Sequence, residues 1–195
     1  MIISFFALMM KRFSNFAKNH SKVNHMKNLI CLFSILFAGS MLFAQEFNKI
    51  VPDPDKNSNI LIGRCNREGL QMDPFKPFFE ENYNKYTSDE NIMKQLKKKM
   101  NDVRILIVLG TWCGDSKEQV PAFYKILDGV KFSDSHIEII AVDRKKVGGD
   151  VDVSGLNIER VPTFVFYRND REIGRIVEKP NSTLEKSMLL ILSQE

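Results

Sequence analysis

The sequence contains few of the residues that build metal centres and disulfide frameworks. Its 195 residues include only 3 histidines and 3 cysteines, and the cysteines, Cys31, Cys65 and Cys113, do not cluster. Zinc and iron–sulfur sites need several such ligands at short spacing. We therefore expect no metal and no cofactor, and at most one disulfide bond among the residues after position 44.

Acidic residues are absent from positions 1–44, which carry 5 lysines and arginines. Residues 45–195 hold 23 basic and 24 acidic residues, so the net charge of +4 comes from the N-terminus. A nucleic-acid-binding domain normally carries a basic surplus on its folded part. This distribution therefore gives no support for a nucleic-acid partner.

Long hydrophobic runs are also scarce. Leu29–Ala44 spans 16 residues and is interrupted by Gly39 and Ser40, which is short of the about 20 residues that a membrane-spanning helix needs. A basic segment, Met26–Asn28, precedes the apolar Leu29–Ala38, and Ala44 supplies a small residue for cleavage. This order is typical of a signal peptide.

We therefore interpret residues 1–44 as a targeting region with a signal peptide at 26–44. Residues 1–25 precede the basic segment, and we interpret them as a start-site artefact, with a real N-terminal extension as the alternative. The protein is then exported, to the periplasm or beyond the cell. An uncleaved segment would instead anchor it to the membrane, facing the periplasm.

Residues 45–86 are predicted to form an extension ahead of the main domain. Residues 45–59 are polar and contain prolines, which favours a flexible lead-in, and 59–63 favours a short edge strand. Asp73 and Pro74 predict the start of a helix. A second helix is predicted after Thr87–Glu90, which resembles a capping box, with its lysines facing water.

Residues 87–195 alternate between strand and helix patterns, which predicts an α/β domain with a central mixed sheet flanked by helices. Four strands are expected at 103–109, 137–142, 163–167 and 172–177, the last two joined by a hairpin turn. Helices are expected at 113–127 and 182–192.

The segment Trp112-Cys113-Gly114-Asp115-Ser116 places a cysteine where the first strand ends and a helix begins. The free N–H groups and the dipole of a helix start favour a thiolate. A thiolate is the form of cysteine that attacks disulfides. Asp115 opposes this effect with its negative charge, and Lys117 is placed to offset it. An inert buried cysteine is the alternative.

This pattern resembles the thioredoxin family over residues 87–194. The resemblance rests on several positions at matching spacing, namely Trp112-Cys113-Gly114, Pro121, Val161-Pro162-Thr163 and Gly174. It implies a thioredoxin-like three-layer sandwich, with 45–86 as an N-terminal helical elaboration. It also implies that Cys113 is the nucleophile, that Pro162 follows a cis peptide bond, and that Val161, Pro162 and Gly174 border the substrate.

Two positions depart from the family pattern. Ser116 stands where a dithiol enzyme has its resolving cysteine, and a hydroxyl does not exchange with a disulfide. Ile107 stands where thioredoxins usually hold a buried aspartate. Cys113 can therefore attack a disulfide, with Ser116 as a possible hydrogen-bond donor to the thiolate, but another thiol must resolve the mixed disulfide.

Three sources of the resolving thiol remain open: a small thiol, a second cysteine of the client, and Cys65. Arg64 and Arg67 flank Cys65 and would favour its thiolate if the sulfur were exposed. The alternatives for Cys65 are an incidental buried cysteine and a permanent disulfide with Cys113. Only the distance between the sulfurs distinguishes these readings.

Two functions follow from these residues. The first is an exported monothiol oxidoreductase or isomerase that acts on disulfide-bearing or thiol-bearing exported proteins. The second is a non-catalytic module that binds peptides in the groove near Trp112 and Val161. Cys-Gly-Asp-Ser is also similar to the motif of monothiol glutaredoxins, but Trp112, the spacing to Pro121 and the export signal argue against that family.

Overall fold

A computed structural model describes residues 47–194, so the predicted targeting region lies outside the described residues. Residues 46–195 belong to one compact unit, which includes both the predicted extension and the predicted main domain. Within the described part of the chain, no helix is long and apolar enough to cross a membrane.

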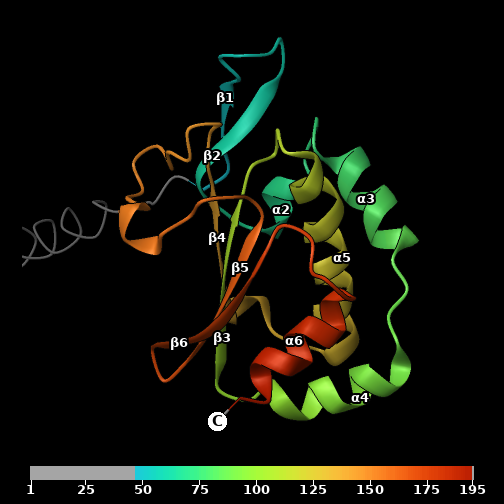
Figure 1. Cartoon of the computed structure of the whole chain (residues 1–195). Helices are drawn as coiled ribbons and strands as arrows, with labels where there is room; N and C mark the ends of the chain where they lie inside the picture. Colours follow the sequence, from blue (N-terminus) through green and yellow to red (C-terminus); the bar gives the residue numbers. More distant parts are fainter. Residues whose placement is uncertain (1–46, 195) are drawn as a thin grey trace, which may run out of the picture. The chain divides into compact units, whose positions relative to one another are not determined.

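Six strands form one mixed sheet in the order β1-β2-β4-β3-β5-β6 (Figure 1). The strands are β1 Lys49–Pro52, β2 Asn59–Cys65, β3 Val103–Leu109, β4 Ile137–Ala141, β5 Thr163–Arg168 and β6 Arg171–Val177. Only β3 and β4 pair in parallel, and a helix connects them, as a parallel crossover requires. The predicted α/β class with a central mixed sheet is confirmed.

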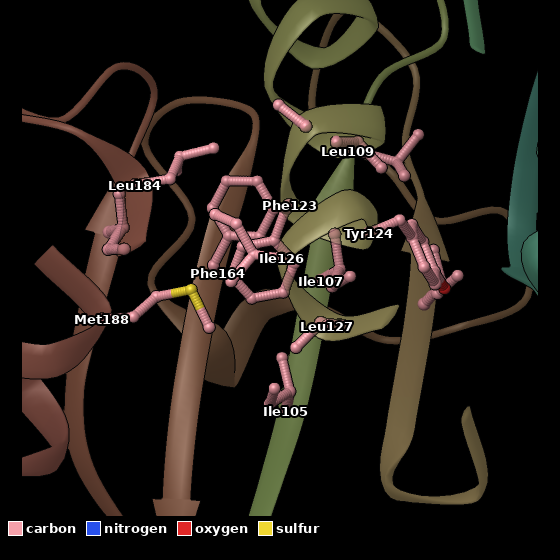
Figure 2. Packing of buried hydrophobic residues seen from close by; sticks show 14 of the residues in the cluster. Ile105, Ile107, Leu109, Phe123, Tyr124, Ile126, Leu127, Phe164, Leu184 and Met188 are labelled. Carbon is pink, nitrogen blue, oxygen red and sulfur yellow. The ribbon is translucent and has the colours of Figure 1, made fainter. Parts of the chain in front are cut away.

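Five α-helices of the described residues contribute to one core on one face of the sheet (Figure 2). They are α2 Arg67–Leu70, α3 Lys76–Lys85, α4 Glu90–Lys99, α5 Gly114–Val130 and α6 Leu184–Leu192. Phe123 of α5 stacks on Phe164 of β5 with ring centroids 4.3 Å apart. Two short 3₁₀ turns, η1 Asp134–His136 and η2 Ser154–Leu156, complete the regular structure.

The opposite face of the sheet carries a smaller apolar cluster without α-helical residues. Leu106 and Val108 of β3 pack there against Val153 and Val161, which belong to the connection between β4 and β5. The third layer is therefore a long connection containing η2. Because both faces of β3 are covered, its sequence is almost continuously apolar, as predicted.

The two predicted helix starts before β3, one in the extension and one at the beginning of the main domain, need correction. Helix α3 begins at Lys76 and has Pro77 in its first turn, where the missing N–H costs no hydrogen bond. Asp73 and Pro74 precede the helix and are joined by a cis peptide bond. Helix α4 is capped by Asp89, whose Oδ1 accepts hydrogen bonds from the N–H groups of Asn91 and Ile92 at 2.7 and 3.1 Å.

The predicted lead-in contains a strand. Strand β1 pairs with β2 as an antiparallel hairpin, so β1 rather than β2 forms the edge of the sheet. Pro52 ends this edge strand, where a residue without an N–H is tolerated. The N–H of Asp53 then donates to the carbonyl of Ser58 at 2.8 Å and closes the turn. With only four residues, β1 is too short to show clear alternation in the sequence.

Candidate functional site

The site lies at the corner where β3 ends and α5 begins. The N–H of Cys113 donates to the carbonyl of Gly110 at 2.8 Å, and Cys113 is the N-cap residue of α5. A Cβ at Gly110 would lie 2.6 Å from the indole of Trp112, so only glycine leaves room for this ring. Local sequence therefore builds the corner and places Cys113 at the start of the helix.

Cys113 faces the loop that precedes β5. Its Sγ donates to the carbonyl oxygen of Val161 at 3.2 Å, and the Val161–Pro162 peptide bond is cis. Val161 is buried, whereas Cys113 is partly exposed. The carbonyl of Pro162 accepts from the N–H of Glu178 at 2.7 Å, which ties this loop to the end of β6. The structure thus brings three predicted site residues, Cys113, Val161 and Pro162, together.

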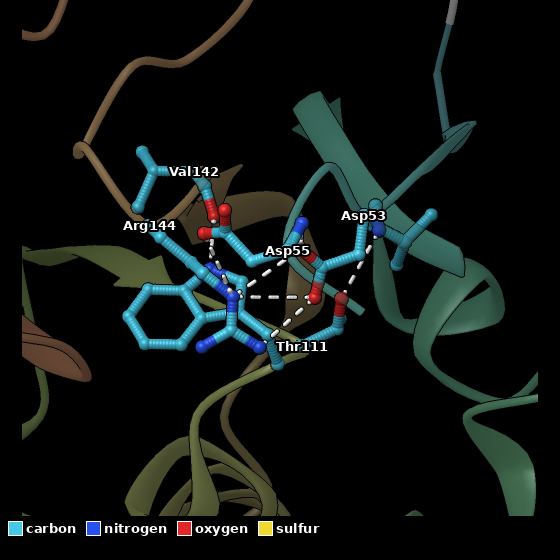
Figure 3. A network of polar contacts seen from close by, with 7 residues as sticks. Asp53, Asp55, Thr111, Val142 and Arg144 are labelled. Carbon is cyan, nitrogen blue, oxygen red and sulfur yellow. Dashed lines mark hydrogen bonds and ion pairs between the residues drawn. The ribbon is translucent and has the colours of Figure 1, made fainter. Parts of the chain in front are cut away.

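Trp112 is held from two sides, by Val142 and Arg144, which Figure 3 labels. Its Nε1 donates to the carbonyl of Val142 at 2.8 Å. The guanidinium of Arg144 lies over the indole, 5.0 Å from the ring centroid. Both contacts come from the segment that follows β4, so Trp112 links this segment to the corner that carries Cys113.

Arg144 is anchored by Asp53 of the N-terminal hairpin. Its Nη2 donates to Oδ2 of Asp53 at 2.9 Å, and its Nε lies 3.2 Å from Oδ1. The Asp53 side chain has no exposed surface. The hydrogen bonds from Arg144 lower the pKa of Asp53, and the hydrogen bond to Asp53 raises the pKa of Arg144.

Arg144 also interacts electrostatically with Cys113, whose negative charge further raises the pKa of Arg144. Sequence reasoning missed this pair, because Asp53 lies in the predicted lead-in and Arg144 in a polar loop. No local pattern joins two residues 91 positions apart.

Ser116 does not face the sulfur of Cys113. It is buried, and its Oγ accepts a hydrogen bond from the N–H of Gly110 at 3.2 Å. Within residues 47–194 no hydrogen bond joins Ser116 to Cys113, so the predicted donor role is not seen in this structure. Ser116 instead holds the end of β3 against α5. Ile107 is buried among core residues behind the site.

Cys65 is the last residue of β2 and lies in the helix-side core, whereas Cys113 packs against the cluster on the opposite face. Both cysteines are free. The N–H of Leu61 donates to Oγ1 of Thr111 at 3.0 Å, which places Leu61 next to the site. Cys65 lies four residues further along β2, or about 13 Å at the usual rise of a strand.

The chemistry of Cys65 also differs from the expectation drawn from its neighbours. Burial raises the pKa of this thiol to about 12. Arg64 bonds to Glu138 and Arg67 bonds to Asp128, so the flanking guanidinium groups are engaged by other carboxylates. The structure therefore does not bring the possible resolver to Cys113.

Gly174 is placed away from the nucleophile. On β6 it pairs with Phe166, three positions from Val177, which pairs with Thr163. A Cβ at Gly174 would lie 2.9 Å from Cγ2 of Ile191. Gly174 therefore allows α6 to pack closely on the sheet, rather than bordering the substrate beside Cys113.

The negative charge of Asp115 is offset by a residue that sequence reasoning did not select. Lys179 lies 3.4 Å from Oδ1 of Asp115 and 2.8 Å from Oε2 of Glu118. Lys117, the residue predicted for this role, instead lies over the ring of Phe78, with its Nζ 4.1 Å from the centroid.

A groove of about 480 Å³ opens beside Trp112. Its lining includes Trp112, Lys117 and Arg144 as well as residues of the extension such as Lys56 and Phe78. In the described part of the chain, no group of three or more His, Cys, Asp or Glu side chains gathers where a metal ion could bind.

Comparisons with known proteins agree on one family. The model of a family described as Thioredoxin matches residues 76–189. A TPR repeat-containing thioredoxin of Arabidopsis thaliana is 29% identical over 102 residues, which cover 52% of this chain and 25% of that protein. The chain thus spans about a quarter of the length of this curated relative.

Two solved structures show weaker likeness. A protein of unknown function from Pseudomonas aeruginosa has a TM-score of 0.48 and 15% identity, covering 62% of this chain and 85% of its own. Mitochondrial thioredoxin 3 of Saccharomyces cerevisiae has a TM-score of 0.34 and 22% identity, covering 55% and 96%. Scores this low add nothing to the fold that the strand order defines.

Proposed function

Because the chain belongs to the thioredoxin family, we propose that it is an exported thiol–disulfide oxidoreductase or isomerase with one reactive cysteine, Cys113. One observation carries the proposal. Cys113, the only partly exposed cysteine of the described residues, stands at the N-cap position of α5, and its thiol donates to the carbonyl of Val161 in the loop before β5. Reactive cysteines of other proteins are found at helix starts and near positive charges.

The reaction begins when the Cys113 thiolate attacks one sulfur of a client disulfide. A new bond joins Sγ to that sulfur, and the other client sulfur leaves as a thiolate. If this thiolate or a further client thiol attacks the mixed disulfide, Cys113 is released and the client has exchanged its disulfide. If an outside thiol attacks, the client leaves reduced. Neither route needs a cysteine at position 116.

The loop at Val161 supplies a place for the client backbone. In the reduced protein the Cys113 thiol donates to the carbonyl of Val161. A mixed disulfide has no S–H, so this carbonyl becomes free to accept from a client N–H. An extended client segment can then pair beside β5 as an added strand. Formation of the covalent bond and binding of the client backbone thus favour each other.

The alternative function is a peptide-binding module without turnover. The burial of Ser116 against Gly110 and of Ile107 in the core favours it, because neither residue can assist resolution of a mixed disulfide. Such a module would use the same loop and Trp112 for binding. Cys113 would then serve at most for covalent capture.

Location is a separate part of the proposal. The basic, apolar and small-residue order of 26–44 supports export, and retention of this segment as an anchor is the alternative. The mass of the protein recovered from the periplasm distinguishes them. A periplasmic protein whose mass shows cleavage after Ala44 would support export of a free domain. A protein with an intact N-terminus in the membrane fraction would support the anchor instead.

Trapping the mixed disulfide tests the chemistry. The purified protein, carrying Cys31→Ser so that an uncleaved chain adds no third thiol, is mixed with a peptide that contains one disulfide. Mass spectrometry should find the peptide on Cys113, and the adduct should persist in Cys65→Ala and vanish in Cys113→Ser.

An isomerase assay tests turnover. Ribonuclease with wrongly paired disulfides should regain its activity when the wild-type protein is added.

Two results would favour the alternative function. One is the absence of any adduct on Cys113 at neutral pH. The other is an adduct that forms but supports no recovery of ribonuclease activity, with or without an added small thiol. Loss of turnover in Cys65→Ala would revive Cys65 as resolver, because its burial would then have to be relieved during the reaction.

A further inference from the structure

The groove beside Trp112 is formed by segments far apart in the sequence. One wall is the β1–β2 turn with Lys56, another is Phe75 and Phe78 near the start of α3, and Arg144 and Trp112 complete it. Its volume of about 480 Å³ lies within the roughly 300–1,000 Å³ usual for small-molecule sites. The predicted extension therefore builds much of a cavity at the edge of the redox site.

The groove carries a surplus of positive charge. Its charged lining residues are Asp53, Lys56, Lys117 and Arg144. Arg144 pairs with Asp53 and also with Asp55, whose Oδ2 lies 3.6 Å from its Nε, so these three residues together carry one negative charge and the surplus of the groove comes from Lys56 and Lys117. Among the described residues no carboxylate forms an ion pair with Lys56 or Lys117. Two ammonium groups thus remain available to an anionic ligand.

The groove is lined by Trp112 and Lys117, which lie on either side of Cys113 in the sequence, and not by Cys113 itself. Lys117 follows Cys113 by one turn of α5, and its N–H donates to the Cys113 carbonyl at 3.1 Å. Residues at this spacing share a helix face. Val161 and Pro162 do not line the groove. A client strand at Val161 therefore leaves the groove open for a second reactant.

We propose that this groove binds a small anionic thiol, one that bears carboxylate groups, and presents it to the mixed disulfide at Cys113. The inference deepens the proposed function by naming the resolving reactant. Ser116 cannot resolve the bond, and Cys65 is buried on the other side of the sheet. The groove supplies both charge and space for the thiol that the chain lacks.

The steps balance as two thiol–disulfide exchanges. The first small thiolate attacks Sγ of Cys113, forms a disulfide with it, and the client sulfur leaves as a thiolate. A second small thiolate then attacks the sulfur of the bound small molecule. Cys113 leaves as a thiolate, and the product is the disulfide of the small thiol. The two small thiols supply the two electrons that reduce the client.

An exchange assay on a preloaded protein tests the inference. Cys113 in the Cys31→Ser/Cys65→Ala background is converted to its mixed disulfide with nitrothiobenzoate, whose release is followed by absorbance. The attacking thiols are glutathione and 3-mercaptopropionate, both anionic, 2-mercaptoethanol, which is neutral, and cysteamine, which is cationic. As a reference, the same thiols are reacted with the mixed disulfide of nitrothiobenzoate and free cysteine. Each rate with the protein is divided by the corresponding reference rate, and the quotient is the normalised rate.

We expect both anionic thiols to exceed the neutral thiol, and cysteamine to be slowest. Lys56→Gln and Lys117→Gln should each slow the anionic thiols about threefold, as expected for one partly screened charge. The rate with 2-mercaptoethanol should fall less than the rates with the anionic thiols in both variants. Lys94→Gln, on an exposed part of α4, is the matched control and should change no rate.

Equal normalised rates for anionic and neutral thiols would overturn the inference. It would also be overturned if only an acidic cysteine-containing peptide reacted faster, because the groove would then bind the client. Saturation by glutathione but not by 3-mercaptopropionate would support the proposal and indicate that the ligand's amide groups contribute. A Cys113 that cannot be loaded with nitrothiobenzoate would contradict the proposed function instead.

Discussion

The two cysteines of the described residues lie on opposite sides of the sheet, and their surroundings differ. On the helix-covered face Cys65 is the end of a strand, enclosed by apolar side chains, and burial raises its pKa to about 12. At the corner after β3, Cys113 caps a helix and meets the carbonyl of Val161 and the charge of Arg144. Position in the fold, rather than residue type, decides which thiol reacts.

The comparison also applies to the packing of the two faces. The helix side holds the large core, with stacked aromatic rings from α5 and β5 (Figure 2). The other side is covered by a connection whose regular structure is one 3₁₀ turn. The site lies where these regions meet, so it is supported by the rigid side and opens towards the less regular one.

The largest expected effect is the difference in reactivity between the two thiols. In the native protein iodoacetamide should label Cys113 at least about 1,000-fold faster than Cys65, because burial both blocks access and disfavours the thiolate. Peptide mapping after timed labelling measures both rates, with the unfolded protein as the reference in which they become similar. Comparable native rates would show that the helix-side core opens readily.

Leu109 and Leu106 lie on opposite faces of β3, so replacing each by alanine compares how much the packing of each face contributes to stability. Leu109→Ala on the helix side should lower the free energy of unfolding by about 3–5 kcal/mol, and Leu106→Ala on the other side by about 2–3 kcal/mol. Both are buried, but the connection that covers Leu106 has more freedom to fill the cavity. Urea denaturation measures both values, and a reversed order would contradict the difference between the faces.

The buried thiol of Cys65 should make the free energy of unfolding depend on pH in the alkaline range. The pKa of Cys65 is raised from 9.0 to about 12, so above pH 9 the unfolded chain loses this proton and the native chain keeps it. The free energy of unfolding should therefore fall by about 1.4 kcal/mol per pH unit from pH 9 towards pH 12. Urea midpoints at pH 8, 9 and 10 measure the slope.

Cys65→Ala is the variant that isolates this contribution. It should remove that part of the slope between pH 9 and 10, whereas the buried tyrosines contribute in both proteins at higher pH. An unchanged slope in Cys65→Ala would mean that Cys65 is solvated in the native state.

The smallest expected effect concerns the guanidinium beside Cys113. Asp53→Asn combined with Arg144→Gln removes both charges and retains a hydrogen-bonding pair. The alkylation rate of Cys113 at pH 7 should fall by at most about twofold, because loss of the Arg144 charge is partly offset by loss of the opposite charge of Asp53. The matched control is Arg104→Gln, because Arg104 also lies over an aromatic ring, that of Tyr167, but remote from Cys113. An equal loss in both would contradict a specific role of Arg144.

Much of the main domain could be predicted from short-range patterns. The continuous apolar run predicted β3, the cysteine at a strand–helix junction predicted the start of α5, and the helix expected at 182–192 is observed as α6. The hairpin turn at Asn169 and Asp170 has positive φ at both residues, which suits these two residue types. Each of these features depends on residues within about one element.

The extension was harder to predict because its signals compete. Asp73-Pro74 and Lys76-Pro77 both offer a proline near a helix start, and packing of Phe75 and Phe79 into the core selects the second. Likewise Thr87 and Asp89 are both N-cap residue types, and Asp89 takes the role. Strand β1 exists because β2 offers it an edge, which four residues of sequence do not reveal.

The sequence by itself determined the family and the strand–helix corner that carries Cys113 and Ser116, because these depend on neighbouring residues and local backbone conformation. Only the tertiary structure decided that Cys65 is buried away from the site, that Lys179 pairs with Asp115, and that Asp53 holds Arg144 against Trp112. These properties arise when distant segments exclude water from one side chain and bring opposite charges together at another, and no local pattern encodes that pairing.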